Sequence, residues 1–301
     1  MADWKQYKNG CYEINCTNIE DLQNIIEDHV SKIPEYIYRG QSKEEYKLIS
    51  TLDRFLNKYY EESKINRVMQ IKYRNFYIKK HLQGFRKLIR GHVDSDEYFT
   101  NDLFTWTLGQ HYGLYTPYLD WTDKPYIALF FAALENHEND CCLYCLNRNY
   151  INILNEFVRE FPPKKYIETY KLDEEDKKYL GIDFKCETNE LQIIDPMTNN
   201  NKRLSAQLGC FTKTPHGESI EEWIDLITED YDNHKSGKFL LKIKIDANLK
   251  KDILKFLDNA NINYSSIYPD LEGISKYCNY VVENNFDNLF NSMYPFCVRK
   301  S

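Results

Sequence analysis

The sequence lacks the hydrophobic segments that membrane insertion or export would require. No stretch of the 301 residues approaches the roughly 18 uninterrupted apolar residues of a membrane span. Residues 1–5 do not begin the basic and then apolar pattern of an export signal. We therefore expect a cytoplasmic protein that has no membrane partner.

The chain also lacks an excess of positive charge. It has 39 lysine and arginine residues against 46 aspartate and glutamate residues, which gives a formal net charge of -7. Overall charge therefore does not indicate an electrostatic nucleic-acid binder. The basic residues that gather between residues 64 and 90 are better explained as a solvated helix face, with a local binding patch as the alternative.

Several common catalytic signatures are missing as well. The sequence has no glycine-rich phosphate loop, zinc-protease helix, serine nucleophile elbow or paired Cys-His signature. Its nine cysteines are an odd number, so disulfides are not expected to stabilise the fold. The spacing of Cys142 and Cys145 has no second pair at the distance of a zinc ribbon, and we expect buried strand thiols and no metal.

What the chain does contain is apolar material for a large core, with 42% hydrophobic residues. Apolar spacing predicts helices at residues 18–32, 53–90, 102–112, from 125 onward, 248–260 and 274–282. Apolar runs and alternation predict strands at residues 36–38, 141–146, 191–194, 210–212 and 239–245. Strands scattered among unequal helices predict an α+β fold, with a small, mixed, mostly antiparallel sheet flanked by helices.

A first candidate site is the segment Tyr38-Arg39-Gly40-Gln41. The pattern places Arg39 at the end of a strand, where a planar guanidinium can bind a phosphate or carboxylate through two parallel hydrogen bonds. Gly40 allows a ligand to approach the backbone, and Gln41 can donate and accept. The alternative is an arginine-carboxylate pair that holds the helical insertion.

A second candidate site is the crowded loop at residues 110–122. His111 is either a ligand contact or general base, or a cap or core hydrogen-bonding group at a helix end. Asp120 and Thr122 either belong to the site or form the N-cap and turn before the helix that Pro125 opens. Further along, Gln207 is the distinctive polar group of a helix that runs through Gly209 into a strand.

At these residues the sequence resembles the FRG domain family, which is named for a Phe/Tyr-Arg-Gly motif that Gln usually follows. The resemblance continues at residues 110–114, 116, 119–122, 128, 203, 206–207, 211–212 and 268–273. It implies one elaborated domain over residues 1–301, with a helical insertion at 53–100 and a variable excursion at 148–189.

The order of segments is also similar to that of ADP-ribosyltransferases of the arginine/serine/glutamate type. In those enzymes a Tyr-Arg-Gly segment on an early strand binds the phosphates of NAD, and the similarity implies the same core and the same cofactor here. Only Thr122 matches their hydroxyl triad, and no Glu-x-Glu or Gln-x-Glu segment opens a late strand. Gln207 stands near that place, and Glu190 is the nearest acid with strand context.

The leading hypothesis is a protein that binds NAD or a related nucleotide and acts on its N-glycosidic bond, as a bacterial toxin or anti-phage effector would. The predicted catalytic residues are Arg39, His111, Thr122, Gln207 and Glu190. The predicted ligand-binding residues are Tyr38, Gly40, Gln41, Gln110, Tyr112, Thr116, Asp120, Trp121 and Arg203, with Tyr112 or Trp121 stacking on a ring.

One alternative is a non-catalytic module that senses a nucleotide or nucleic acid, or that binds a protein target. Another is a metal-dependent nuclease built on Asp120, Asp123 and Asp270.

Overall fold

A computed structural model describes residues 3–33, 35–64, 67–135, 138–163, 189–196, 202–230 and 237–293. Within these residues the core is one eight-stranded sheet in the order β1-β2-β8-β5-β3-β4-β7-β6. The strands are β1 (Lys5–Lys8), β2 (Cys11–Cys16), β3 (Tyr36–Gln41), β4 (Leu119–Thr122), β5 (Cys141–Asn147), β6 (Gln192–Ile194), β7 (Gly209–Lys213) and β8 (Leu240–Ile245). The predicted mixed, mostly antiparallel sheet is confirmed, since β2 and β8 form the parallel pair and the other neighbours are antiparallel.

Strand β5 shows how the sheet is covered on both faces. All seven of its residues are buried. Cys141, Leu143 and Cys145 pack in one hydrophobic cluster, and Cys142, Tyr144 and Leu146 pack in another. Because successive side chains of a strand point to opposite faces, the two clusters are the two layers of the core. The three cysteines of β5 are therefore buried thiols, as predicted.

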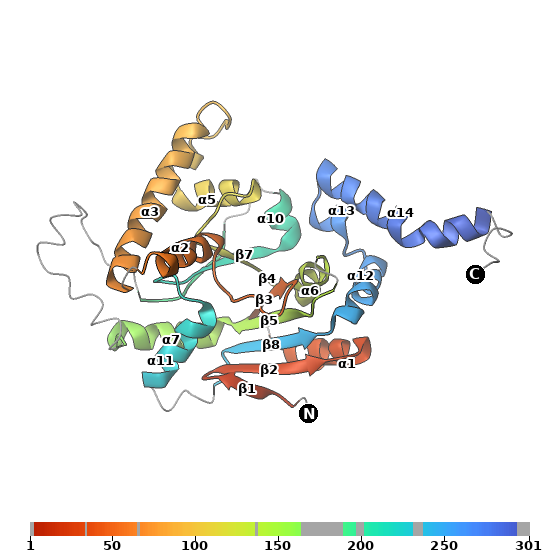
Figure 1. Ribbon diagram of the computed structural model, residues 1–301, viewed down its shortest axis with the longest axis horizontal. Helices are drawn as coiled ribbons and strands as arrows, with labels where there is room; N and C mark the ends of the chain where they lie inside the picture. The colour runs from red at the N-terminus through yellow and green to blue at the C-terminus, as the bar shows by residue number, and fades with distance from the viewer. Residues whose placement is uncertain are drawn as a thin grey trace, which may run out of the picture.

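Helices form both layers. The first cluster includes residues of α1 (Ile19–Asn24), the π-helical turn η1 (Ile25–Val30), α6 (Pro125–Ala133), α12 (Lys250–Asn259) and α13 (Tyr264–Ile267). The second includes residues of α7 (Arg148–Glu160) and α11 (Ile220–Asp230). A short turn, η3 (Ala247–Leu249), precedes α12, and α14 (Leu271–Met293) extends away from the sheet (Figure 1).

The region predicted as a helical insertion, residues 53–100, contains α2 (Thr51–Glu62), α3 (Arg67–Leu88) and α4 (Glu97–Thr100). These helices pack with α5 (Asp102–His111), which was predicted as a separate helix, around a small core of their own. Leu52, Leu82 and Trp106 belong to a third cluster that joins α2, α3 and α5. Helices α2 and α5 both contact α3, and in Figure 1 these three helices lie on the opposite side of the molecule from α14. The short helix α10 (Lys202–Gln207) leads into β7.

The structure corrects the predicted elements at several places. Strands β1 and β2 were not predicted, and β4 was interpreted as part of a loop. The helix predicted at residues 18–32 changes from α to π geometry at Ile25. Most of the variable excursion, residues 164–188, lies outside the described residues. In the part of the chain that is described, no helix has the length and apolar character to cross a membrane.

Candidate functional site

A cavity of about 520 Å³ lies where two neighbouring strands stop pairing. Strand β3 pairs with β5 along six residues but meets β4 only at Tyr38 and Thr122. Beyond that pair, residues 39–41 of β3 and residues 120–121 of β4 line the cavity. The volume is within the range of about 300–1,000 Å³ that is usual for small-molecule sites.

Arg39 bridges the gap between the two strands. Its Nη1 donates to the backbone carbonyl of Asp120 at 2.7 Å and lies 3.9 Å from the Asp120 carboxylate. Its Nε is buried and has no hydrogen-bond partner among the described residues. Burial lowers the pKa of Arg39; Asp120 opposes this shift, and the nearby charge of Arg54 adds to it. Arginine nevertheless stays protonated at neutral pH, so the cavity wall carries an incompletely satisfied cation.

Arg39 is not at the strand end, where the sequence pattern had placed it. Strand β3 continues through Gly40 and Gln41, which pair with Leu143 and Cys142 of β5. The arginine is therefore held by a continuous ladder on one side and faces the opened edge toward β4 on the other.

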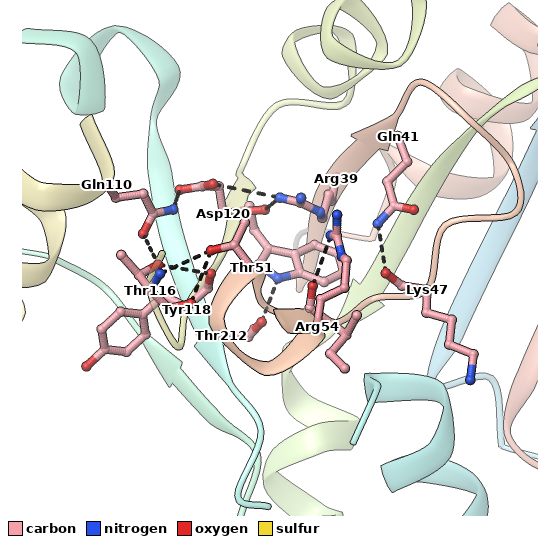
Figure 2. A network of polar contacts seen from close by, with 12 residues as sticks. Arg39, Gln41, Lys47, Thr51, Arg54, Gln110, Thr116, Tyr118, Asp120 and Thr212 are labelled. Atoms are coloured by element: carbon pink, nitrogen blue, oxygen red, sulfur yellow. Dashed lines mark hydrogen bonds and ion pairs between the residues drawn. The ribbon is translucent and has the colours of Figure 1, made fainter. Parts of the chain in front are cut away.

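A chain of hydrogen bonds holds Asp120 against this arginine, as Figure 2 shows. Gln110 at the end of α5 donates from Nε2 to Asp120 at 2.6 Å and accepts at Oε1 from Thr116 at 2.7 Å. The Thr116 backbone N–H in turn donates to the Thr51 hydroxyl at 3.1 Å. The Asp120 side chain is 59% exposed, yet it lies within the cavity, and desolvation by the surrounding protein raises its pKa although Arg39 opposes the shift.

Helix α2 contributes residues that the sequence did not indicate. Thr51 and Arg54 from its first turns line the cavity, and so does Tyr46 from the preceding loop. The guanidinium of Arg54 lies 5.8 Å from the centre of the Tyr46 ring. No motif or spacing distinguishes Arg54 from the other basic residues of its helix. Its position at the cavity depends on how the helical insertion packs against the sheet, which the local sequence does not show.

Further lining residues come from α5, α10 and the segment after α13. They are His111, Arg203, Gln207 and Tyr268. Burial lowers the pKa of His111, and Arg203 acts in the same direction, so the imidazole is neutral at pH 7. Arg203 is already engaged by two carboxylates, Asp270 at 2.5 Å and Glu272 at 2.7 Å.

Thr122 and Gln207 meet through the backbone of α10. The Thr122 hydroxyl donates to the Gln207 carbonyl at 2.6 Å and accepts from the Lys124 backbone N–H at 3.2 Å. The alternative interpretation of Thr122, a residue that shapes the turn before α6, therefore agrees with these contacts. The side-chain amide of Gln207 donates to the carbonyl of Ile267 at 3.5 Å.

Several predicted ligand-binding residues have clear structural partners. Trp121 is 2% exposed, and its Nε1 donates to the Thr212 hydroxyl at 2.8 Å. Tyr38 donates to the Val30 carbonyl at 3.4 Å. The amide of Gln41 donates to the Lys47 carbonyl at 3.5 Å, while its buried Oε1 has no partner within the described chain.

Three predicted site residues do not line this cavity. Tyr112 is 77% exposed, and Thr116 is buried beneath Gln110. Glu190 forms an ion pair with Arg159 of α7 at 3.0 Å. The carboxylates that do line the cavity are Asp120 and Glu135, the latter just after α6.

The three aspartates of the nuclease alternative are held by different arginines. Asp123 pairs with Arg148 at 3.2 Å, Asp270 with Arg203, and Asp120 faces Arg39. Over the residues that are described, no group of three or more His, Cys, Asp or Glu side chains is arranged to hold a metal ion.

Comparison with known proteins gives one match. Residues 34–141 match the model of the FRG domain family, a segment that runs from just before β3 to the first residue of β5 and includes Arg39, Arg54 and Asp120. No curated protein matches the chain, and no solved structure matches it. The chain therefore contains an FRG domain at residues 34–141, which supplies the arginine-carboxylate wall of the cavity.

Proposed function

We propose that the cavity binds NAD or a related nucleotide and that the protein cleaves or transfers at the N-glycosidic bond. The observation that carries this proposal is the state of Arg39, which lines a cavity large enough for a nucleotide. Its guanidinium is partly buried, and its partners are one carbonyl and one more distant carboxylate. Its buried Nε has no hydrogen-bond partner among the described residues. A phosphate would complete its hydrogen bonding, since the fork of an arginine can make two parallel bonds to phosphate oxygens.

The other lining residues suit the rest of such a ligand. Tyr46, Phe131 and Tyr268 offer aromatic rings for the base or the nicotinamide. Tyr112 and Trp121, the rings expected from the sequence, are less suitable because one lies outside the cavity and the other is buried.

The cavity also supports a glycosidic reaction. When the bond between ribose C1′ and the nicotinamide nitrogen breaks, its electron pair leaves with nicotinamide and C1′ becomes positively charged. The Asp120 carboxylate would stabilise this charge. Glu190, the acid that the resemblance suggested, pairs with Arg159 outside the cavity. Water or another acceptor forms the new C1′–O bond and gives its proton to neutral His111. Cleavage of cellular NAD by this route would suit a toxin or an anti-phage effector.

Nicotinamide release from NAD tests this reaction. We expect the purified protein to release nicotinamide, alone or with cell extract that supplies an acceptor. Asp120→Asn should lower the rate about 100-fold or more because the amide does not stabilise a developing cation. Asp252→Asn, an exposed change on α12, is the matched control. No release from the folded protein in either condition would contradict the reaction.

A second candidate function is nucleotide or nucleic-acid sensing without catalysis. The observation that favours it is the surface of α3, where Lys79, Lys80 and Lys87 are exposed and Lys80 lies 5.5 Å from the centre of the Phe76 ring. Basic and aromatic side chains together bind single-stranded nucleic acid. Binding of an oligonucleotide that weakens steeply with salt, without nicotinamide release, would favour this function.

A further inference from the structure

We propose that Arg54 is the second anion-binding residue of the cavity, and that Arg39 and Arg54 together select ligands that carry two linked phosphate groups. This inference rests on the proposed function, because it assumes that the cavity receives a nucleotide. It adds a residue that lies outside the Tyr-Arg-Gly-Gln motif, and it names the chemical class of the ligand: a diphosphate in preference to a monophosphate.

Arg54 has few partners of its own. Its Nη2 donates to the Ile49 carbonyl at 3.4 Å, and its guanidinium lies beside the Tyr46 ring. Within the described ranges, no carboxylate lies within ion-pair distance of it. The side chain is exposed and lines the cavity.

The two guanidiniums lie near each other in the cavity. Figure 2 shows both in the same part of the cavity, and the charge of Arg54 is close enough to lower the pKa of Arg39. Two like charges in a partly desolvated site repel each other. A bound anion with two negative centres would relieve this repulsion, whereas an anion with one centre would engage the pair less completely.

Arg203 lines the same cavity but is in a different state. Its guanidinium binds both Asp270 and Glu272 and lies 5.1 Å from the centre of the Tyr268 ring. A ligand would have to displace these carboxylates to reach it. Among the described residues that line the cavity, Arg39 and Arg54 are therefore the arginines available to an added anion.

The backbone that carries Arg54 is fixed by its neighbour in the sequence. Asp53 is 1% exposed and accepts from Nε of Arg74 of α3 at 2.6 Å, and Arg74 also donates to the carbonyls of Thr214 and Pro215. The Ser50 hydroxyl caps α2 by accepting from the Asp53 backbone N–H at 3.0 Å. This anchoring holds the first turn of α2 at the cavity, so binding does not have to order it.

Calorimetric titration with four probes tests the inference. The probes are inorganic phosphate, inorganic pyrophosphate, AMP and ADP, at about 0.15 M salt so that weak surface attraction is screened. We expect the protein to bind pyrophosphate and ADP at least about 10-fold more tightly than phosphate and AMP. Arg54→Gln should remove most of that preference, and Arg54→Lys should keep part of it because the charge remains without the fork.

Lys58→Gln is the matched control, since Lys58 is an exposed cation one turn further along α2 that does not line the cavity. It should keep the full preference, and thermal unfolding will show whether each variant is folded. The inference is overturned if Arg54→Gln keeps the diphosphate preference, or if the unmodified protein has none.

These outcomes separate the inference from the proposed function. Nicotinamide release that depends on Asp120, without any diphosphate preference, would overturn the inference alone. A diphosphate preference that depends on Arg54, without nicotinamide release, would support the inference and contradict the proposed reaction. Failure of all four probes to bind would overturn the inference.

Discussion

The pairing of Arg39 with Asp120 makes the cavity sensitive to pH. Desolvation raises the pKa of the Asp120 carboxyl, so it takes up a proton at a higher pH than an ordinary aspartate does. Its negative charge opposes a ligand phosphate at neutral pH, and this opposition disappears as the pH falls through the raised pKa. The sign of the effect is therefore fixed: acid should strengthen the binding of an anionic ligand.

The affinity for NAD should accordingly rise as the pH falls, and the rise should begin at a higher pH than the titration of a free aspartate would give. Asp120→Asn should bind NAD more tightly at neutral pH and lose the part of the pH dependence that Asp120 contributes, while protonation of His111 is common to both proteins. Calorimetric titration over a pH series measures the effect, and NAD suits it because the charge of its phosphates is constant from neutral to mildly acidic pH. An equally steep pH dependence in the variant would assign the effect to another group.

The individual residues show what a sequence pattern can and cannot supply. Arg39, Gln110, His111 and Asp120 lie in recognisable motifs, and all four line the cavity. Arg54 has no comparable signal. Glu190 was selected because it is an acid before an expected strand, but that criterion does not report which way a side chain faces, and its partner is Arg159.

At the scale of the elements, Gly40 is where α6 packs closely on β3. A Cβ atom at Gly40 would lie 1.8 Å from the Ala128 carbonyl oxygen and 2.5 Å from the Ala132 backbone nitrogen. The glycine of the motif is thus required by packing between a strand and a helix, in addition to its place in the lining of the cavity.

Gly40→Ala should therefore lower the free energy of unfolding by about 3 kcal/mol, as overpacking does in a tight core. Gly84→Ala is the control: nothing lies within 4 Å of the added Cβ, and alanine in the middle of α3 should stabilise the protein by about 0.5–1 kcal/mol. Denaturant unfolding compares the two variants. Equal stability of the variants would refute the packing role.

The buried pair of Asp53 and Arg74 holds the helical insertion to the loop after β7. Arg74→Met should destabilise the protein by about 3–5 kcal/mol, because it leaves a buried carboxylate without its partner. Replacing both residues, Arg74→Met with Asp53→Leu, should recover much of that loss. Urea unfolding measures both variants, and a single variant as stable as the unmodified protein would show that the pair does not anchor the insertion.

The elements that the sequence predicted are those with long or strongly apolar patterns. Strand β4 was missed because four residues with two buried apolar positions give too short an alternation to stand out beside Pro117 and Gly113. Strands β1 and β2 carry polar and charged residues, such as Lys5 and Glu13, that hide their pairing. Strand β1 pairs with β2, and β2 pairs with β8, which is more than 220 residues away in the sequence.

At the scale of the whole molecule, the cavity joins parts of the chain that are far apart. Most lining residues come from the FRG segment, whereas Arg203, Gln207 and Tyr268 lie beyond residue 141. The sequence predicted the class of the fold and many of the lining residues, Arg203 and Gln207 among them. How these distant segments come together depends on the order of the strands, which no local pattern contains.

The most direct test of this account is the affinity of NAD for the unmodified protein and for Arg39→Gln, measured by calorimetry near neutral pH. Arg159→Gln is the matched control, since this exposed arginine pairs with Glu190 outside the cavity. We expect the unmodified protein to bind NAD and Arg39→Gln to bind it about 10- to 100-fold more weakly, the loss expected for charge-assisted hydrogen bonds. Arg159→Gln should bind NAD as tightly as the unmodified protein does. Equal affinity in all three proteins, or no binding by the unmodified protein, would contradict it.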